Sequence, residues 1–324
     1  MKKYSHLVFW ILLLMLIVTT YISLVTGKLP LSVEQLITKI TTGNEPKVDA
    51  VIDLRMPRII IAIFVGAVLS VSGALLQAVL QNPLAEANII GVTSGALVAR
   101  GVILIFLPSL YFFLPIFIFI GGLIPFLVLF LLVSRYHITP IRLILVGVAI
   151  YAMLNGVLEL FSMSPVMQLP TGFTMKVWQD VYIIVAFSIV GLTIAYMLAE
   201  KVNLLSFDDK QANNIGFNIT KYRLIIGLVA VFLASSATAI VGQLAFVGLI
   251  VPHIVRRLVG SNYKKVIPIS MVFGAWIVLL ADTLGRAIAP PLEISASIIT
   301  TVIGGPCLIY LICKGAYGNA NRER

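Results

Sequence analysis

Long apolar runs separated by short polar segments occupy almost the whole chain. A bilayer core about 30 Å thick is crossed by roughly 20 residues of α-helix, and most of these runs have that length. Eight are clear, at residues 7–27, 59–80, 89–107, 110–133, 143–163, 181–199, 266–285 and 297–313. The pattern predicts an all-α polytopic membrane protein in which residues 1–324 form one transmembrane domain.

A further apolar run, residues 224–255, is longer than one crossing requires. At a rise of about 1.5 Å per residue it would form a helix of about 48 Å, which exceeds the bilayer core. Gly242 and Gln243 interrupt the run. We therefore expect two helices here, the second of them short, and about ten spans in total.

The positions of the basic residues support ten spans, because Lys and Arg accumulate in short cytoplasmic loops. One helix over 224–255 would place "RRLVGSNYKK" and the basic end of the chain outside. Ten spans with both termini in the cytoplasm place 15 of the 23 basic residues inside: Lys2, Lys3, Arg135, Arg142, Lys201, Lys210, Lys221, Arg223, Arg256, Arg257, Lys264, Lys265, Lys314, Arg322 and Arg324. The first run is long and has no small-x-small cleavage site, so we favour a retained span over a signal peptide.

Composition excludes a soluble domain, since 60% of the residues are hydrophobic, 11% are charged and the mean hydropathy is +1.07. The net charge of +10 reflects membrane orientation, and no basic face with a nucleic-acid-binding motif accompanies it. Cys307 and Cys313 share one apolar run and imply no disulfide framework.

Three arginines are expected on the outside, against the positive-inside trend. Arg55 and Arg58 in "LRMPR" precede the run at 59–80, and Arg286 ends the ninth span at the same level. An interfacial arginine often reaches to the lipid head groups. A cluster of three also calls for acidic partners. These are either an external protein with carboxylates or the local acids Asp49, Asp53, Asp282 and Glu293.

Two charged residues fall inside predicted spans, Arg100 and Glu159. A charge at the centre of a membrane helix costs about 2.5 to 3.5 kcal/mol, so such residues tend to face a bundle interior or an aqueous path. Counted from the cytoplasmic ends, Arg100 is about 18 Å and Glu159 about 24 Å deep. We expect them to form an ion pair. Arg100, Asn155 and Glu159 are the candidate pathway residues.

Two polar segments face the cytoplasm in this topology. In "QNPLAEANIIG", Pro83 disfavours helix at Asn82, so the chain must break there, either as an ordinary turn or as part of a gate. In "LLSFDDKQANNIGFN", apolar residues followed by Gly216 predict short helices lying under the membrane. No G-x-x-x-x-G-K-[ST] phosphate loop occurs in the chain, so an ATP-driven process would need another polypeptide.

Two long stretches carry a family resemblance. "LRMPRIIIAIFVGAVLSVSGALLQAVLQNPLAEANIIGVTSGA" and "GQLAFVGLIVPHIVRRLVGSNYKKVIPISMVFGAWIVLLADTLGR" resemble the signatures of the FecCD family of ABC importer permeases, which carry cobalamin, iron-siderophores or heme. Outside them, "SLVTGKLPLS", "MLNGVLEL", "TMKVW" and "LEISA" are similar to the heme-transporting members. The resemblance implies a type II ABC importer permease fold in the cytoplasmic membrane of a Gram-positive bacterium. It also implies heme or an iron chelate as cargo, with no permanently bound cofactor or metal. With heme as the cargo, the alternative to the Arg100–Glu159 ion pair is that Arg100 lies near the heme propionates.

The resemblance also assigns roles and partners. The expected partners are a pair of cytoplasmic ATPase subunits, a second permease copy and an extracellular substrate-binding lipoprotein. The family usually has Gly where Asp208 stands, which changes the first turn of the ATPase-facing segment. The implied residues are Arg55, Arg58 and Arg286 for docking of the lipoprotein, Asn82, Pro83, Leu84 and Thr139 for the cytoplasmic gate, and Phe207, Asp208, Asp209, Ala212, Ile215 and Gly216 for ATPase coupling.

Other function classes are weaker fits. An ion-coupled secondary transporter usually carries intramembrane acids, and only Glu159 is a candidate here. A membrane-embedded enzyme would need a catalytic motif, and neither HExxH nor a nucleophile elbow is present. Small residues in "GAVLSVSGA" and "ASSATA" permit close helix contact, which we assign to internal packing and not to a dimer interface.

Overall fold

The computed structural model describes residues 5–26, 46–136, 140–164, 172–205, 216–288 and 292–320. Within these ranges the secondary structure is helical and contains no strand. The helices are α1 (Ser5–Val25), α3 (Pro46–Val79), α4 (Val92–Phe106), the 3-10 helix η1 (Pro108–Phe113), α5 (Leu114–Tyr136), α6 (Pro140–Ser162), α7 (Trp178–Met197), α8 (Ala199–Leu204), α10 (Ile219–Val241), α11 (Val247–Val259), α12 (Tyr263–Ile288) and α13 (Ala296–Ala320).

Each predicted apolar run is a helix. Seven helices of the described chain are long and apolar enough to cross a membrane, and α4 and α13 contribute shorter apolar helices. Together with the 13-residue α11, they make ten. The all-α polytopic prediction is confirmed.

The predicted break in the run 224–255 is also confirmed. Helix α10 ends at Val241, and Gly242 follows with a φ of 77°. The short α11 begins at Val247, after Phe246 with a φ of 69°. The left-handed backbone at Gly242 is readily adopted by glycine and ends the helix, so α11 continues in a new direction.

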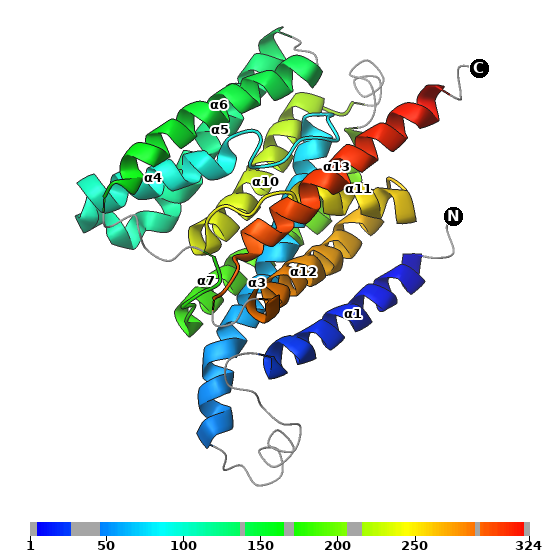
Figure 1. The fold of residues 1–324 in the computed structure, drawn as a ribbon. Helices are drawn as coiled ribbons and strands as arrows, with labels where there is room; N and C mark the ends of the chain where they lie inside the picture. Colours follow the sequence, from blue (N-terminus) through cyan, green and yellow to red (C-terminus); the bar gives the residue numbers. More distant parts are fainter. Residues whose placement is uncertain are drawn as a thin grey trace.

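Helix α3 is the central element of the bundle, with α7, α10, α11 and α12 packed around it (Figure 1). It is longer than expected, because it begins at Pro46 and not at residue 59. Proline is favoured in the first helical turn, and Asp49 in that turn complements the helix dipole. Arg55 and Arg58 therefore lie on the helix itself, and Pro57 between them does not end it.

Two pairs of glycines let the backbones of α3 and its neighbours touch. A β-carbon added to Gly66 would lie 2.2 Å from the carbonyl oxygen of Gly274 in α12. One added to Gly73 would lie 1.8 Å from the carbonyl oxygen of Gly248 in α11. The small residues of "GAVLSVSG" thus serve internal packing, as predicted.

The bundle has two distinct ends (Figure 1). The start of α1 and the end of α13 lie at one end, as the predicted topology requires, and the start of α3 projects at the other. We call the end with the start of α3 and the C-terminus of α12 the outer end, and the end with the turn at 80–91 and α8 the inner end. Helices α1 and α6 pack at the periphery and expose large apolar side chains, including Trp10 and Leu160.

Candidate functional site

The outer end carries the predicted arginines, and Arg58 is paired inside the protein. Its Nε lies 2.9 Å from Asp282 Oδ2, and its Nη2 lies 2.8 Å from Asp282 Oδ1, so the guanidinium contacts both carboxylate oxygens. Its Nη1 donates to Glu293 Oε2 at 2.7 Å. The Asp282 side chain is 1% exposed and that of Glu293 is 31% exposed. Two of the four acids proposed as local partners thus pair with Arg58.

Arg55 and Arg286 bind the end of α1. Arg55 Nη1 donates to the carbonyl oxygens of Leu24 and Val25. Arg286 donates to the carbonyl oxygens of Ser23 and Thr26 and to the Ser23 hydroxyl, and its Nε lies 3.4 Å from Asp282 Oδ2. A cation at a helix C-terminus stabilises the unpaired carbonyls there. The structure brings the three predicted arginines together and gives them internal partners.

A polar pocket opens where α10 ends. Its volume is about 220 Å³. Four parts of the chain that are far apart in sequence meet there: α4, the segment before α7, the α10–α11 break and the start of α13. The lining residues are Leu97, Gly172, Phe173, Val241, Gly242, Gln243, Leu244, Ser295 and Ser297.

Below the pocket, amide and hydroxyl groups connect α4, α6 and the break. Asn155 Nδ2 of α6 donates to Ser94 Oγ at 3.2 Å, and Gln243 Nε2 donates to the same oxygen at 3.0 Å. Asn88 Nδ2 donates to the carbonyl oxygen of Leu244 at 2.9 Å. Asn155 was predicted as a pathway residue. Ser94 and Gln243 were not, although the position of Gln243 in the predicted break was the available signal.

The expected ion pair between Arg100 and Glu159 is wrong. Among the salt bridges of the described residues none joins them, and Glu159 is exposed on α6. The depth of each residue in the membrane was estimated from residue counts, but the direction in which its side chain leaves the helix was not. Gly101 of α4 faces α6, because an added β-carbon there would lie 2.4 Å from Phe161. Successive helix residues are rotated by about 100°, so Arg100 points elsewhere.

Lys176 precedes α7 and is bonded to the end of α10. Its Nζ donates to the carbonyl oxygen of Ile240 at 2.6 Å, at the C-terminus of α10. Burial lowers the pKa of Lys176, the positive charge of Arg100 lowers it further, and Asp180 opposes both. Lys176 is thus anchored at the end of α10, whose last residue, Val241, lines the polar pocket. Lys176 is not among the 15 basic residues predicted to face the cytoplasm, and the sequence suggested no function for it.

The turn at the inner end, residues 80–91, follows the predicted break after α3. Asn82 is buried, and its Oδ1 accepts a hydrogen bond from the Leu84 amide at 2.9 Å. This side-chain turn, followed by Pro83, prevents the helix from continuing. We call residues 80–91 the gate turn. Thr139, the remaining predicted gate residue, lies outside the described residues.

The gate turn is bonded to α11. Glu86 is buried, and its Oε1 accepts from the Gly248 amide at 3.2 Å, at the N-terminus of α11, where a carboxylate complements the helix dipole. Gln77, near the end of α3, donates to the carbonyl oxygens of Gly248 and Leu249 and accepts from Arg256. Helix α11, the gate turn and the end of α3 thus form one hydrogen-bonded unit.

Comparison with known proteins decides the family. The model of the FecCD transport family matches residues 15–314 of the chain. The chain belongs to the FecCD transport family.

The relatives agree with this assignment. The "Probable heme-iron transport system permease protein IsdF" of Staphylococcus aureus strain MSSA476 is 59% identical over 313 residues, 97% of each chain, and that of strain Newman is 58% identical. A solved metal-chelate type ABC transporter in an inward-facing conformation is 30% identical, with a TM-score of 0.80 over 96% of this chain and 99% of that chain. PsaBC from Streptococcus pneumoniae is 20% identical with a TM-score of 0.53, covering 85% of this chain and 94% of that chain, and shows only the fold. This FecCD protein is a multi-pass cell-membrane permease of an ABC importer.

The predicted ATPase-coupling residues of this FecCD permease fall largely outside the described chain. These are Phe207, Asp208, Asp209, Ala212 and Ile215. Gly216 is described and has a φ of +71°, but the short helix that it was predicted to end lies outside the described residues. Asn218 then caps α10, since its Oδ1 accepts from the Lys221 amide at 3.0 Å.

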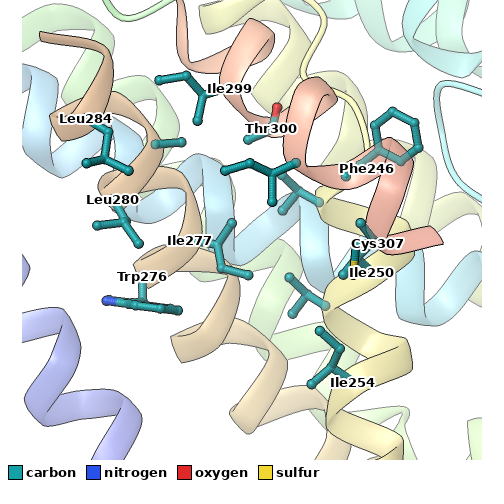
Figure 2. A pocket seen from close by; sticks show the side chains of 15 residues that line it. Phe246, Ile250, Ile254, Trp276, Ile277, Leu280, Leu284, Ile299, Thr300 and Cys307 are labelled. Atoms are coloured by element: carbon teal, nitrogen blue, oxygen red, sulfur yellow. The ribbon is translucent and has the colours of Figure 1, made fainter. Parts of the chain in front are cut away.

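The permease also has an apolar cavity of about 250 Å³ between α11, α12 and α13 (Figure 2). Phe246 lies at one side of it and Trp276 at another. Thr300 and Cys307 are the only lining side chains with a polar atom besides the indole of Trp276. The described residues that line the cavity offer no charged partner to an anionic or cationic cargo, and we assign it no part in the pathway.

Proposed function

We propose that this chain is the permease subunit of an ATP-driven importer for heme. The observation that carries the proposal is 59% identity, over 97% of both chains, to a permease named for heme-iron transport. The chain has no phosphate-binding loop, so a separate pair of ATPase subunits hydrolyses ATP. A second copy of the permease completes the pore. A metal chelate is the alternative cargo, because a structural relative with 30% identity carries that name.

Docking of an extracellular binding lipoprotein is proposed at the arginine cluster of Arg55, Arg58 and Arg286. These side chains are largely buried and internally paired, so an incoming carboxylate must compete with an existing partner. Glu293 is the most accessible partner, at 31% exposed against 1% for Asp282. The lipoprotein's carboxylate would replace Glu293 at Arg58 Nη1. Such charge complementarity contributes more to orientation and rate than to affinity.

The pathway is proposed to run from the polar pocket to the gate turn. Arg100 of α4 and Lys176, whose Nζ is bonded at the C-terminus of α10, would meet the propionate carboxylates of heme at the outer end. Asn155 lies below them, and Glu159 is exposed on α6, facing outward from this chain. Asn82, Pro83 and Leu84, with Thr139, would close the inner end. The segment with Phe207, Asp208, Asp209, Ala212, Ile215 and Gly216 would bind the ATPase.

The function is tested with the complex of permease, ATPase subunits and binding lipoprotein in nanodiscs. We expect ATP hydrolysis to rise when the lipoprotein is loaded with heme, and to rise less with a siderophore-loaded or cobalamin-loaded homologue. Equal stimulation by a siderophore-loaded protein would transfer the proposal to a metal chelate. Failure of the permease to copurify with any ATPase would refute it.

The docking site is tested by Glu293→Gln. If docking exchanges carboxylates at Arg58, removal of the internal competitor strengthens lipoprotein binding. The gain is a few-fold, because the exchange involves one partly exposed charged hydrogen bond. Glu200→Gln at the inner end is the matched control and leaves binding unchanged. Unchanged or weakened binding in Glu293→Gln, measured by surface plasmon resonance on nanodiscs, would reject the exchange.

A further inference from the structure

Helix α8 is fastened to the start of α12 at the inner end. Asn203 Oδ1 accepts from the Tyr263 amide at 2.8 Å, and Asn203 Nδ2 lies 3.2 Å from Asn262 Oδ1. Glu200 of α8 forms a salt bridge with Lys264. Helix α8 and the first turn of α12 are therefore expected to move together.

Gln81, at the start of the gate turn, is hydrogen-bonded to the end of α8. Its Nε2 donates to the carbonyl oxygen of Leu205 at 2.9 Å. Leu205 is buried and is the C-cap residue of α8, where carbonyls have no partner within the helix. The two residues are 124 positions apart, so the bond connects separate elements and not a local turn.

The backbone of Gln81 is unusual. Its φ is +48°, a left-handed conformation that glutamine seldom adopts. The residue lies two positions after Val79, the last residue of α3, and precedes Asn82, whose amide donates back to the Gln77 carbonyl at 3.1 Å. The torsion at Gln81 therefore sets the direction in which the gate turn leaves α3. A conformation of this kind persists where its surroundings hold it.

We infer that Gln81 is a positioning residue that transmits displacement of α8 to the gate turn. The inference rests on the proposed function, in which the segment after α8 binds the ATPase and the gate turn closes the pathway. The side chain of Gln81 contacts α8, and its backbone fixes the start of the gate turn. A shift of the Leu205 carbonyl thus acts at the residue that orients Asn82 and Pro83.

The test separates side-chain contact from backbone strain. Asparagine and glycine both tolerate a positive φ, but Asn is one methylene shorter and Gly has no side chain. In Gln81→Asn and Gln81→Gly, we expect the complex to assemble with wild-type thermal stability and near wild-type ATP hydrolysis. The heme transported per ATP hydrolysed should fall about fivefold, within the range expected for losing one hydrogen bond. Gln179→Asn, the same change at the exposed outer start of α7, is the control and keeps the wild-type ratio.

The outcomes are distinguishable. A wild-type transport ratio in Gln81→Asn and Gln81→Gly overturns the inference, and so does loss of assembly or of thermal stability in both, which indicates a scaffold role. Absence of ATP-dependent heme uptake by the wild-type complex instead refutes the proposed function, whatever the variants do.

Discussion

The two ends of the bundle are held by different kinds of interaction. At the outer end, one buried carboxylate, Asp282, contacts Arg58 and Arg286. At the inner end, α8 is connected to its neighbours by neutral hydrogen bonds of Gln81 and Asn203 and by the exposed Glu200–Lys264 salt bridge. Breaking a buried ion pair costs about 3–5 kcal/mol, whereas a neutral hydrogen bond contributes about 0.5–1.5 kcal/mol. The outer end is therefore built to keep its shape, and the inner end can rearrange at low cost.

This difference matches what each end must do in a transporter. A docking surface needs a fixed arrangement of charges, because orientation of the partner depends on it. A gate must exchange one set of contacts for another during each cycle, and contacts of small net energy permit this. Substitutions that alter one end at a time show whether the two ends differ in this way.

The largest effect is expected for Asp282→Ala. The substitution leaves Arg58 and Arg286 without their shared buried partner, which is expected to lower the free energy of unfolding by about 3–5 kcal/mol. Thermal unfolding of the purified permease in detergent measures it. Asn203→Ala, its inner-end counterpart, should cost about 1 kcal/mol. Equal losses in the two variants would show that the ends do not differ.

An intermediate effect is expected where α3 connects the two ends. Gly73→Ala would place a β-carbon 1.8 Å from the Gly248 carbonyl oxygen, so α3 and α11 must separate. Overpacking of this kind costs about 1–3 kcal/mol. The control is Gly156→Ala in α6, where an added β-carbon meets nothing within 4 Å. If both alanines melt at the wild-type temperature, the close α3–α11 contact is unnecessary.

The smallest effect is expected for the exposed pair Glu200 and Lys264 at the inner end. Lys264 lowers the pKa of Glu200, so the pair favours the folded state at pH values above the unfolded pKa, and this contribution is lost as the pH falls through the lowered value. Both side chains are more than half exposed. Glu200→Gln should leave the unfolding temperature unchanged between pH 5 and 8. A marked pH-dependent loss would contradict the view of a weakly held inner end.

The fold was largely predictable because membrane spans follow from local composition. Helix length and Gly242 predicted the α10–α11 break, and Pro83 predicted the end of α3. The start of α3 at Pro46 was missed, since its first turns are polar enough to read as a loop.

The candidate site was predictable only at residues whose chemistry restricts where they can lie, such as the arginines. The three arginines cluster as expected, but their partners lie up to 263 positions away in sequence, and no local pattern fixes such pairs. The ion pair between Arg100 and Glu159 was wrongly expected because the two residues lie at similar depths in the membrane. The directions in which their side chains leave the helices were not considered. Gln81 was missed because its role depends on a backbone torsion and a carbonyl 124 positions away.

The most direct test of the account is heme uptake into proteoliposomes that contain the permease and its ATPase, with heme-loaded lipoprotein outside and no ion gradient. We predict uptake that requires ATP and stops when ATP hydrolysis is blocked. Uptake by the permease alone, driven by an ion gradient without ATPase or ATP, would contradict the account.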